Sequence, residues 1–176
     1  LTPMLKFVFV LFYVILAPFV GAFADSMAKG RVMFVSNTIK IVGCSLLFFA
    51  MHQYSALAAY AVVGLGAAAY SPAKYGILTE LLPPEQLVTA NGWIEGLTVA
   101  SIVLGTVLGG VLITPSVATL ILSFDFPIID TGIDSAVEAS IIIIGVFYAI
   151  AAIFNLFIPD TGVDHRIVKF SPLFLV

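Results

Sequence analysis

Three ionisable side chains stand inside long apolar runs of this sequence. Lys40, Lys74 and Glu95 each lie roughly 10 to 12 Å, at a rise of about 1.5 Å per residue, from the end of their helix that we expect to be cytoplasmic. A charge that faces lipid without a partner is costly, so each of these residues needs a polar neighbour. Two ammonium groups and one carboxylate at one depth predict a polar cavity or an ion-pair cluster, in which Glu95 neutralises one of the two lysines.

The alternative for both lysines is that their side chains extend to the headgroup region of the membrane. Pro72 and Gly76 flank Lys74, which favours a broken or closely packed helix over a plain lipid-facing turn. Asn37 lies on the same helical face as Lys40. It either extends the charged cluster or forms a hydrogen bond across a helix interface.

The elements that position these residues are apolar helices. Hydrophobic residues make up 61% of the chain, charged residues 10%, and the mean hydropathy is +1.18, so the chain has too little polar surface for a water-soluble domain. A helix crosses the bilayer with about 20 mainly apolar residues. The predicted fold class is an all-α membrane protein with five transmembrane spans, at about 4–24, 32–51, 57–78, 88–113 and 139–158.

Basic residues in the short loops predict the orientation. One side of the membrane holds four of them, Lys29, Arg31, Arg166 and Lys169, whereas the other side holds at most Lys6. The first side should be cytoplasmic by the positive-inside rule, and residues 159–176 should begin a cytoplasmic linker. The acidic loop 114–135, with Asp125, Asp130 and Asp134, then lies outside, and we expect an interfacial turn around residues 117–124.

Small residues predict where helices pack closely. Gly64 and Gly66 belong to a Gly and Ala stretch of the third span, and Gly105 and Gly109 form a GxxxG pair in the fourth, with Gly110 beside it. The single cysteine, Cys44, is expected to be a small packed hydrophobe.

Several function classes are excluded by what the sequence lacks. It has no G-x-S-x-G, no H-E-x-x-H and no phosphate-binding loop, and neither His52 nor His165 has an Asp five residues later, so we expect no enzyme, no cofactor and no metal site. The net charge is −3 and no basic stretch suggests nucleic acid. The chain begins and ends in apolar patches, so we expect a fragment of a larger protein, with the remaining transporter helices as partners.

The first turn between spans resembles a loop of the major facilitator superfamily. That loop has a Gly, an Asp four residues later, and then a Gly with basic residues, which fits Gly21, Asp25, Lys29, Gly30 and Arg31. By this resemblance Asp25 and Arg31 help to hold an inward gate. The residues themselves require only a tight turn, a helix cap and positive anchors.

The fourth span adds a second resemblance. Gly96, Gly105 and Gly109 are similar in spacing to the glycines on helix 5 of the superfamily's antiporters. Gly110 stands where that pattern has a proline, so no antiport mechanism is carried over.

Residues 64–78, together with Ala90-Asn91-Gly92 and Glu95, resemble the bacterial lysophospholipid transporter family most closely. The resemblance implies twelve helices, of which these are helices 2 to 6. It also implies inward transport of lysophosphatidylethanolamine and related lysolipids across the inner membrane for reacylation, beside or fused to an acyltransferase and acyl-carrier-protein synthetase. Residues 126–132 fall in the variable part of this resemblance.

A lysolipid carries a phosphate, so lysines of a cavity are suitable partners for it. Lys74 is the first candidate and Lys40, with Asn37, the second, while Glu95 serves as counter-ion or binds the ethanolamine ammonium. Two alternatives stay open. One is a major facilitator exporter of drugs or metabolites, and the other is a non-transporting membrane anchor for a fused acyltransferase.

Overall fold

The computed structural model describes residues 2–122 and 135–162. This part of the chain is all helical, as the sequence predicts. The six helices are α1 (Thr2–Asp25), α2 (Lys29–Phe48), α3 (Gln53–Leu81), α4 (Pro84–Leu112), α5 (Pro115–Leu122) and α6 (Ala136–Asn155). Several residues of the expected loops lie outside the described residues, namely Asp125, Asp130, Asp134, His165, Arg166, Lys169 and the segment 126–132.

Four of these helices, α2, α3, α4 and α6, are long and apolar enough to cross a membrane. α1 provides a fifth candidate if its two parts, Met4–Leu16 and Phe19–Asp25, form one span with a bend of 63°. The bend falls at Pro18, whose backbone has no N–H to donate to the helix. The bilayer boundaries of the five spans stay a prediction, because helix ends alone do not position a membrane.

Local sequence explains where the helices begin and end. α3 ends at Leu81, because Leu82 adopts an extended conformation before Pro83, and α4 then begins with Pro84 at its first position. Ser135 caps α6 through a capping box with Glu138. The short helix α5 covers residues 117–122 of the expected turn, while residues 123 and 124 lie outside the described residues, and its interfacial position stays a prediction.

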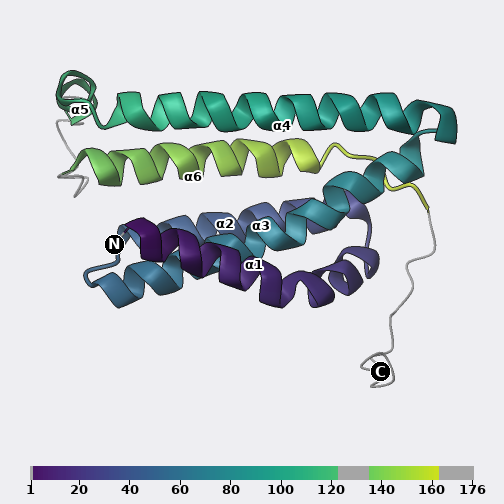
Figure 1. Cartoon of the computed structure of the whole chain (residues 1–176), viewed down its shortest axis with the longest axis horizontal. Coiled ribbons are helices and arrows are strands. Elements are labelled where there is room, and N and C mark those ends of the chain that lie inside the picture. The colour runs from purple at the N-terminus through teal and green to yellow at the C-terminus, as the bar shows by residue number, and fades with distance from the viewer. Residues whose placement is uncertain (1, 123–134, 163–176) are drawn as a thin grey trace.

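The helices form a bundle in which α3 packs on both α1 and α2, and α6 packs on α2 (Figure 1). The core between α1, α2 and α3 contains Ala24, Val32, Met33 and Ala73. α4 runs beside α6 and presents most of its surface outward, with Leu112 as its one buried residue among those described. The turn between α1 and α2, the turn between α3 and α4, and the end of α6 lie at one end of the bundle.

Glycines allow α2 and α3 to approach closely. A Cβ added at Gly66 would lie 2.7 Å from both the Lys40 Cγ and the Ser36 carbonyl oxygen, and one at Gly43 would lie 2.6 Å from a Val63 methyl group. A Cβ at Gly64 would meet a ring carbon of Phe9 on α1 at 3.3 Å.

By contrast, Gly96, Gly105, Gly109 and Gly110 on α4 meet nothing within 4 Å among the described residues. The expected packing of this α4 face therefore stays a prediction.

Candidate functional site

The turn between α1 and α2 is organised by Lys29, whose side chain is 8% exposed. Its ammonium group donates a hydrogen bond to the Ala24 carbonyl oxygen at 2.9 Å and pairs with Asp25 at 2.5 Å. It also lies 3.9 Å from a carboxylate oxygen of Glu80 near the end of α3. We call Asp25, Lys29, Glu80 and Thr161 the turn cluster.

The other members of the turn cluster join three helix ends. Thr161, which follows α6, donates a hydrogen bond to Glu80 at 2.6 Å. Gly76 on α3 leaves room for the Lys29 stem, because a Cβ there would lie 3.1 Å from the Lys29 Cε. Gly30 leaves room for the segment after α6, because a Cβ added at Gly30 would lie 3.0 Å from the Cβ of Ile158. The turn cluster therefore ties the α1–α2 turn to both α3 and the segment after α6.

The expected gate stays a prediction, and the structure shows how its residues lie. Asp25 pairs with Lys29, whereas the Arg31 side chain is exposed. The physical reason is position on the helix. Lys29 is four residues after Asp25 and enters the gap beside α3, while Arg31, two residues later, is turned by about 200° around α2. Gly21 meets nothing within 4 Å among the described residues.

Lys40 lies in a separate buried site between α2, α3 and α6. Its ammonium group donates a hydrogen bond to the Asn37 side-chain oxygen at 3.1 Å. The same group lies 4.3 Å from the ring centre of Tyr70 and 5.2 Å from that of Tyr148. Cation–π attraction and the amide thus replace the water that a buried ammonium group loses. The Asn37 amide nitrogen and the Ser36 hydroxyl are buried without a hydrogen-bond partner in the part of the chain described.

Lys74 is more accessible and faces α4. Its ammonium group donates a hydrogen bond to the Thr98 hydroxyl at 2.9 Å and lies 4.7 Å from the ring centre of Tyr75. The Thr98 hydroxyl in turn donates to the Ile94 carbonyl oxygen at 2.7 Å. A cavity of about 290 Å³, which we call the α3–α4 cleft, is lined by Lys74, Ile94, Leu97, Thr98 and Ser101.

Glu95 has a different partner from the one that the sequence suggested. Its carboxylate accepts a hydrogen bond from the Tyr75 hydroxyl, and no ion pair joins it to Lys40 or Lys74 within the described ranges. The three charges therefore do not form one cluster, because Lys40 faces the α2–α6 interface and Lys74 faces α4. Lys74 on α3 and Glu95 on α4 nevertheless both form hydrogen bonds between these two helices.

Sequence reasoning missed several residues of these sites. Glu80 carries a signal, since a carboxylate near the end of an apolar helix favours a polar or charged partner, whereas Thr161 carries none. Tyr75, Thr98 and Tyr148 carry no such signal, because hydroxyl and aromatic residues are common in membrane helices.

Comparison with known families settles the class of protein. The family model described as Major Facilitator Superfamily matches residues 4–173. The chain belongs to the major facilitator superfamily. It is accordingly a multi-pass membrane protein, and its helices form part of a major facilitator bundle.

Within this superfamily the chain is similar to curated proteins named lysophospholipid transporter LplT. It is 42% identical over 170 residues to that of Serratia proteamaculans strain 568, which covers 97% of this chain and 37% of the relative. It is 45% identical over 157 residues to that of Yersinia enterocolitica, covering 89% of this chain and 33% of the relative. The protein of Yersinia pestis strain Pestoides F is 45% identical over 170 residues, and this alignment covers 97% of this chain and 36% of the relative.

The chain thus spans about a third of the length of the curated relatives that it matches. No solved structure is significantly similar to it. The major facilitator match includes the turn cluster, both lysine sites and the α3–α4 cleft, since all of them lie within residues 4–173.

Proposed function

We propose that this chain is part of a secondary transporter that moves lysophospholipids of the lysophosphatidylethanolamine type across the bacterial inner membrane. The names of the similar proteins support the substrate class. The observation in the structure that carries the proposal is the α3–α4 cleft, where a partly exposed lysine borders an apolar cavity. Such a cavity suits a molecule with one phosphate and one acyl chain.

Lys74 is the proposed ligand of the lipid phosphate. An ammonium group has three N–H donors, and the hydrogen bond to Thr98 uses one of them. The others are available to phosphate oxygens, and a charge-assisted bond of this kind is stronger than a neutral one. Leu97 and Ile94 give the same cleft an apolar wall for the start of the acyl chain.

Glu95 is the proposed partner of the ethanolamine ammonium. It lies three residues before Thr98 on α4, so the two side chains are neighbours on one helix face. Tyr75 donates to one carboxylate oxygen and leaves the other lone pairs of Glu95 for a cation. Glu95 does not line the α3–α4 cleft, but it lies about one helical turn from Thr98, to which Lys74 donates, so a positive and a negative group are available to a zwitterionic headgroup bound there.

Lys40 and Asn37 are the second candidate for the phosphate. Both side chains are buried, and the Lys40 ammonium group lies beside two tyrosine rings, so this site is less accessible than Lys74. The turn cluster, with Gly21, Gly30 and Arg31, is the proposed inward gate. We also propose that an acyltransferase and acyl-carrier-protein synthetase, adjacent or fused, reacylates the delivered lysolipid.

A flipping assay on the full-length protein in liposomes tests this proposal with labelled lysophosphatidylethanolamine. The variant Lys74→Met should slow transport by about tenfold, because a hydrogen bond to a charged group contributes about 1.5–3 kcal/mol. Lys6→Met is the matched control, since Lys6 is an exposed lysine of α1, and it should transport at the parent rate.

The outcomes separate the possible errors. If the parent protein moves the lysolipid no faster than empty liposomes, the proposed function is wrong, and an exporter or a non-transporting anchor takes its place. If the parent transports and Lys74→Met does so equally fast, the function stands and the assignment of Lys74 fails.

A further inference from the structure

A hydroxyl group of the segment after α6 reaches the turn cluster. Thr161 donates a hydrogen bond to one carboxylate oxygen of Glu80 at 2.6 Å, although the two residues are 81 positions apart in the sequence. The other carboxylate oxygen of Glu80 lies 3.9 Å from the Lys29 ammonium group. Glu80 therefore stands between the segment after α6 and the α1–α2 turn, with one oxygen directed to each.

The orientation of Glu80 depends on Thr161. The Glu80 side chain is 12% exposed, so its carboxylate is largely withdrawn from water. The contact with Thr161 is a hydrogen bond, whereas 3.9 Å is too long for one and leaves an electrostatic attraction to Lys29. A buried carboxylate that loses its donor is destabilised, and it regains water by turning outward, away from Lys29.

The sequence Pro159-Asp160-Thr161-Gly162 positions the Thr161 hydroxyl by local turn chemistry. The Asp160 side chain accepts a hydrogen bond from the Gly162 N–H at 3.2 Å. Gly162 has a φ of 67°, in the left-handed region that glycine adopts without strain. Such a turn is set by the residues that form it. The direction of Thr161 is therefore built into the segment and does not depend on the contact with α3.

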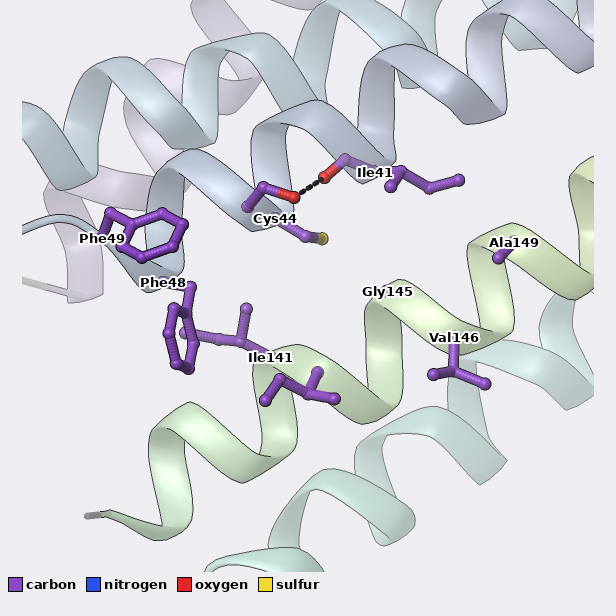
Figure 2. A pocket seen from close by; sticks show the side chains of 10 residues that line it. Ile41, Cys44, Phe48, Phe49, Ile141, Gly145, Val146 and Ala149 are labelled. Carbon is purple, nitrogen blue, oxygen red and sulfur yellow. Dashed lines mark hydrogen bonds between the residues drawn. The ribbon is translucent and has the colours of Figure 1, made fainter. Parts of the chain in front are cut away.

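In its middle part, α6 packs on α2 through contacts that have no direction. There the two helices face each other across an apolar cavity of about 420 Å³ (Figure 2). The hydrogen bond drawn in this region runs from the Ser45 hydroxyl to the Ile41 carbonyl oxygen and stays within α2. Apolar packing is non-directional. Beyond the end of α6, Ile158 packs on the core of α1, α2 and α3, and Thr161 then adds a directional contact with α3.

We propose that Thr161 is a positioning residue of the turn cluster. By holding one oxygen of Glu80, it keeps the other oxygen toward Lys29 and so fastens the α1–α2 turn to α3. The segment after α6, where the sequence predicts the start of a cytoplasmic linker, thereby sets how firmly this turn is held. The meaning of this contact for transport rests on the proposed function, in which the turn cluster is the inward gate.

Hydrogen exchange measured by mass spectrometry on the full-length protein in nanodiscs tests this role. The reporters are the amides of Arg31 and Val32, which donate to the Ala28 carbonyl oxygen in the first turn of α2. Thr161→Val removes the hydroxyl at nearly constant volume. The reporter amides should then exchange about tenfold faster, because the local structure loses a hydrogen bond to a charged group. Thr161→Ser keeps the hydroxyl and should retain the parent rate.

Two further variants separate positioning from a general loss of stability. Thr79→Val removes an exposed hydroxyl beside Glu80 that donates to the Gly76 carbonyl oxygen within α3, so the reporter amides should exchange as in the parent. In a Glu80→Gln background, Thr161→Val should add no more than about twofold, because the group through which Thr161 acts no longer carries the charge that attracts Lys29.

The proposal is overturned if Thr161→Val exchanges like the parent, or if Thr161→Ser or Thr79→Val exchanges as fast as Thr161→Val. It is also overturned if the effects of Thr161→Val and Glu80→Gln simply add. The flipping assay decides the proposed function separately, since a parent protein that moves no lysolipid refutes the gate without altering these exchange rates.

Discussion

The ammonium group of Lys29 is the best-coordinated charge at the end of the bundle that carries the α1–α2 turn. It contacts the Ala24 carbonyl oxygen, Asp25 and Glu80 while it is almost fully buried. The exposed partner, Asp25, adds little by itself, since surface ion pairs contribute about 0–1 kcal/mol. The buried contacts matter more, because the Ala24 carbonyl oxygen would lose this donor without gaining a water, and Glu80 would keep only its hydrogen bond from Thr161.

Replacing Lys29 by Met should therefore destabilise the full-length protein. We expect a loss of about 1–3 kcal/mol, because the Ala24 carbonyl oxygen would lose this donor and Glu80 would lose its neighbouring positive charge. Thermal unfolding in detergent measures the effect. Arg31→Met removes a basic residue of the same turn whose side chain is exposed, so it should change stability by less than about 0.5 kcal/mol. Equal losses in both variants would show that Lys29 acts only through the net charge of the turn.

At this scale the sequence predicts which residues are polar but not how they pair. The pattern around Asp25 predicted the family, which the comparison confirms, and the position of Lys40 and Lys74 within apolar runs was visible from their neighbours. The sequence did not show that Lys29, rather than Arg31, is the buried basic residue of this turn, because that depends on where the end of α3 places Glu80. The partner of Glu95 was missed for the same reason, since Tyr75 comes from another helix.

At the scale of the elements, the α2–α3 pair is the closest helix contact of the bundle. Gly66 makes it possible, because its absent side chain lets Lys40 and the Ser36 backbone lie against α3. The same contact holds the Lys40 stem in place beneath the ring of Tyr70. The α2–α3 interface thus positions one of the two candidate phosphate ligands.

Gly66→Ala should destabilise the protein, although alanine is the better helix former. The added methyl would sit 2.7 Å from its neighbours, and overpacking of this kind costs about 1–3 kcal/mol. The higher helix propensity of alanine over glycine stabilises the helix by at most about 1 kcal/mol, which does not offset this cost. Gly92→Ala is the control, since a Cβ there meets nothing within 4 Å of the described residues, and it should be neutral or stabilising. Unfolding temperatures of both variants decide the question, and a Gly66→Ala protein as stable as the parent would refute tight packing at this position.

The ends of the helices were more predictable from the sequence than their contacts. Pro83 and Pro84 stop α3 and begin α4 by backbone chemistry that needs no tertiary contact. The glycines of α3 were recognised as packing residues, whereas Gly43 was not, because it stands alone among larger residues of α2. The glycines of α4 follow an equally clear pattern, yet no described helix covers them.

On the scale of the whole molecule, the charge distribution predicts which end of the bundle faces the cytoplasm. The turn between α1 and α2 carries Lys29 and Arg31, while the turn between α2 and α3 carries no lysine or arginine. Basic residues in short loops stay on the cytoplasmic side during insertion. Residues near the first turn should therefore be accessible only from the cytoplasm, and those near the second only from outside.

Single cysteines test this orientation in the full-length protein after Cys44→Ala removes the native thiol of this segment. Ser26→Cys and Gln53→Cys are placed at exposed positions of the two turns. A membrane-impermeant maleimide should label Ser26→Cys in inside-out vesicles and Gln53→Cys in right-side-out vesicles. Labelling of both variants after detergent treatment is the control for access.

The opposite labelling pattern would have consequences for each proposed site. Lys74 would then lie in the outer half of the membrane, so the α3–α4 cleft would take its lipid headgroup from the other leaflet. The turn cluster would become an outward gate. Labelling of one variant from both sides would instead mean that the turn around it enters a water-filled path, because an impermeant reagent cannot cross the hydrocarbon core.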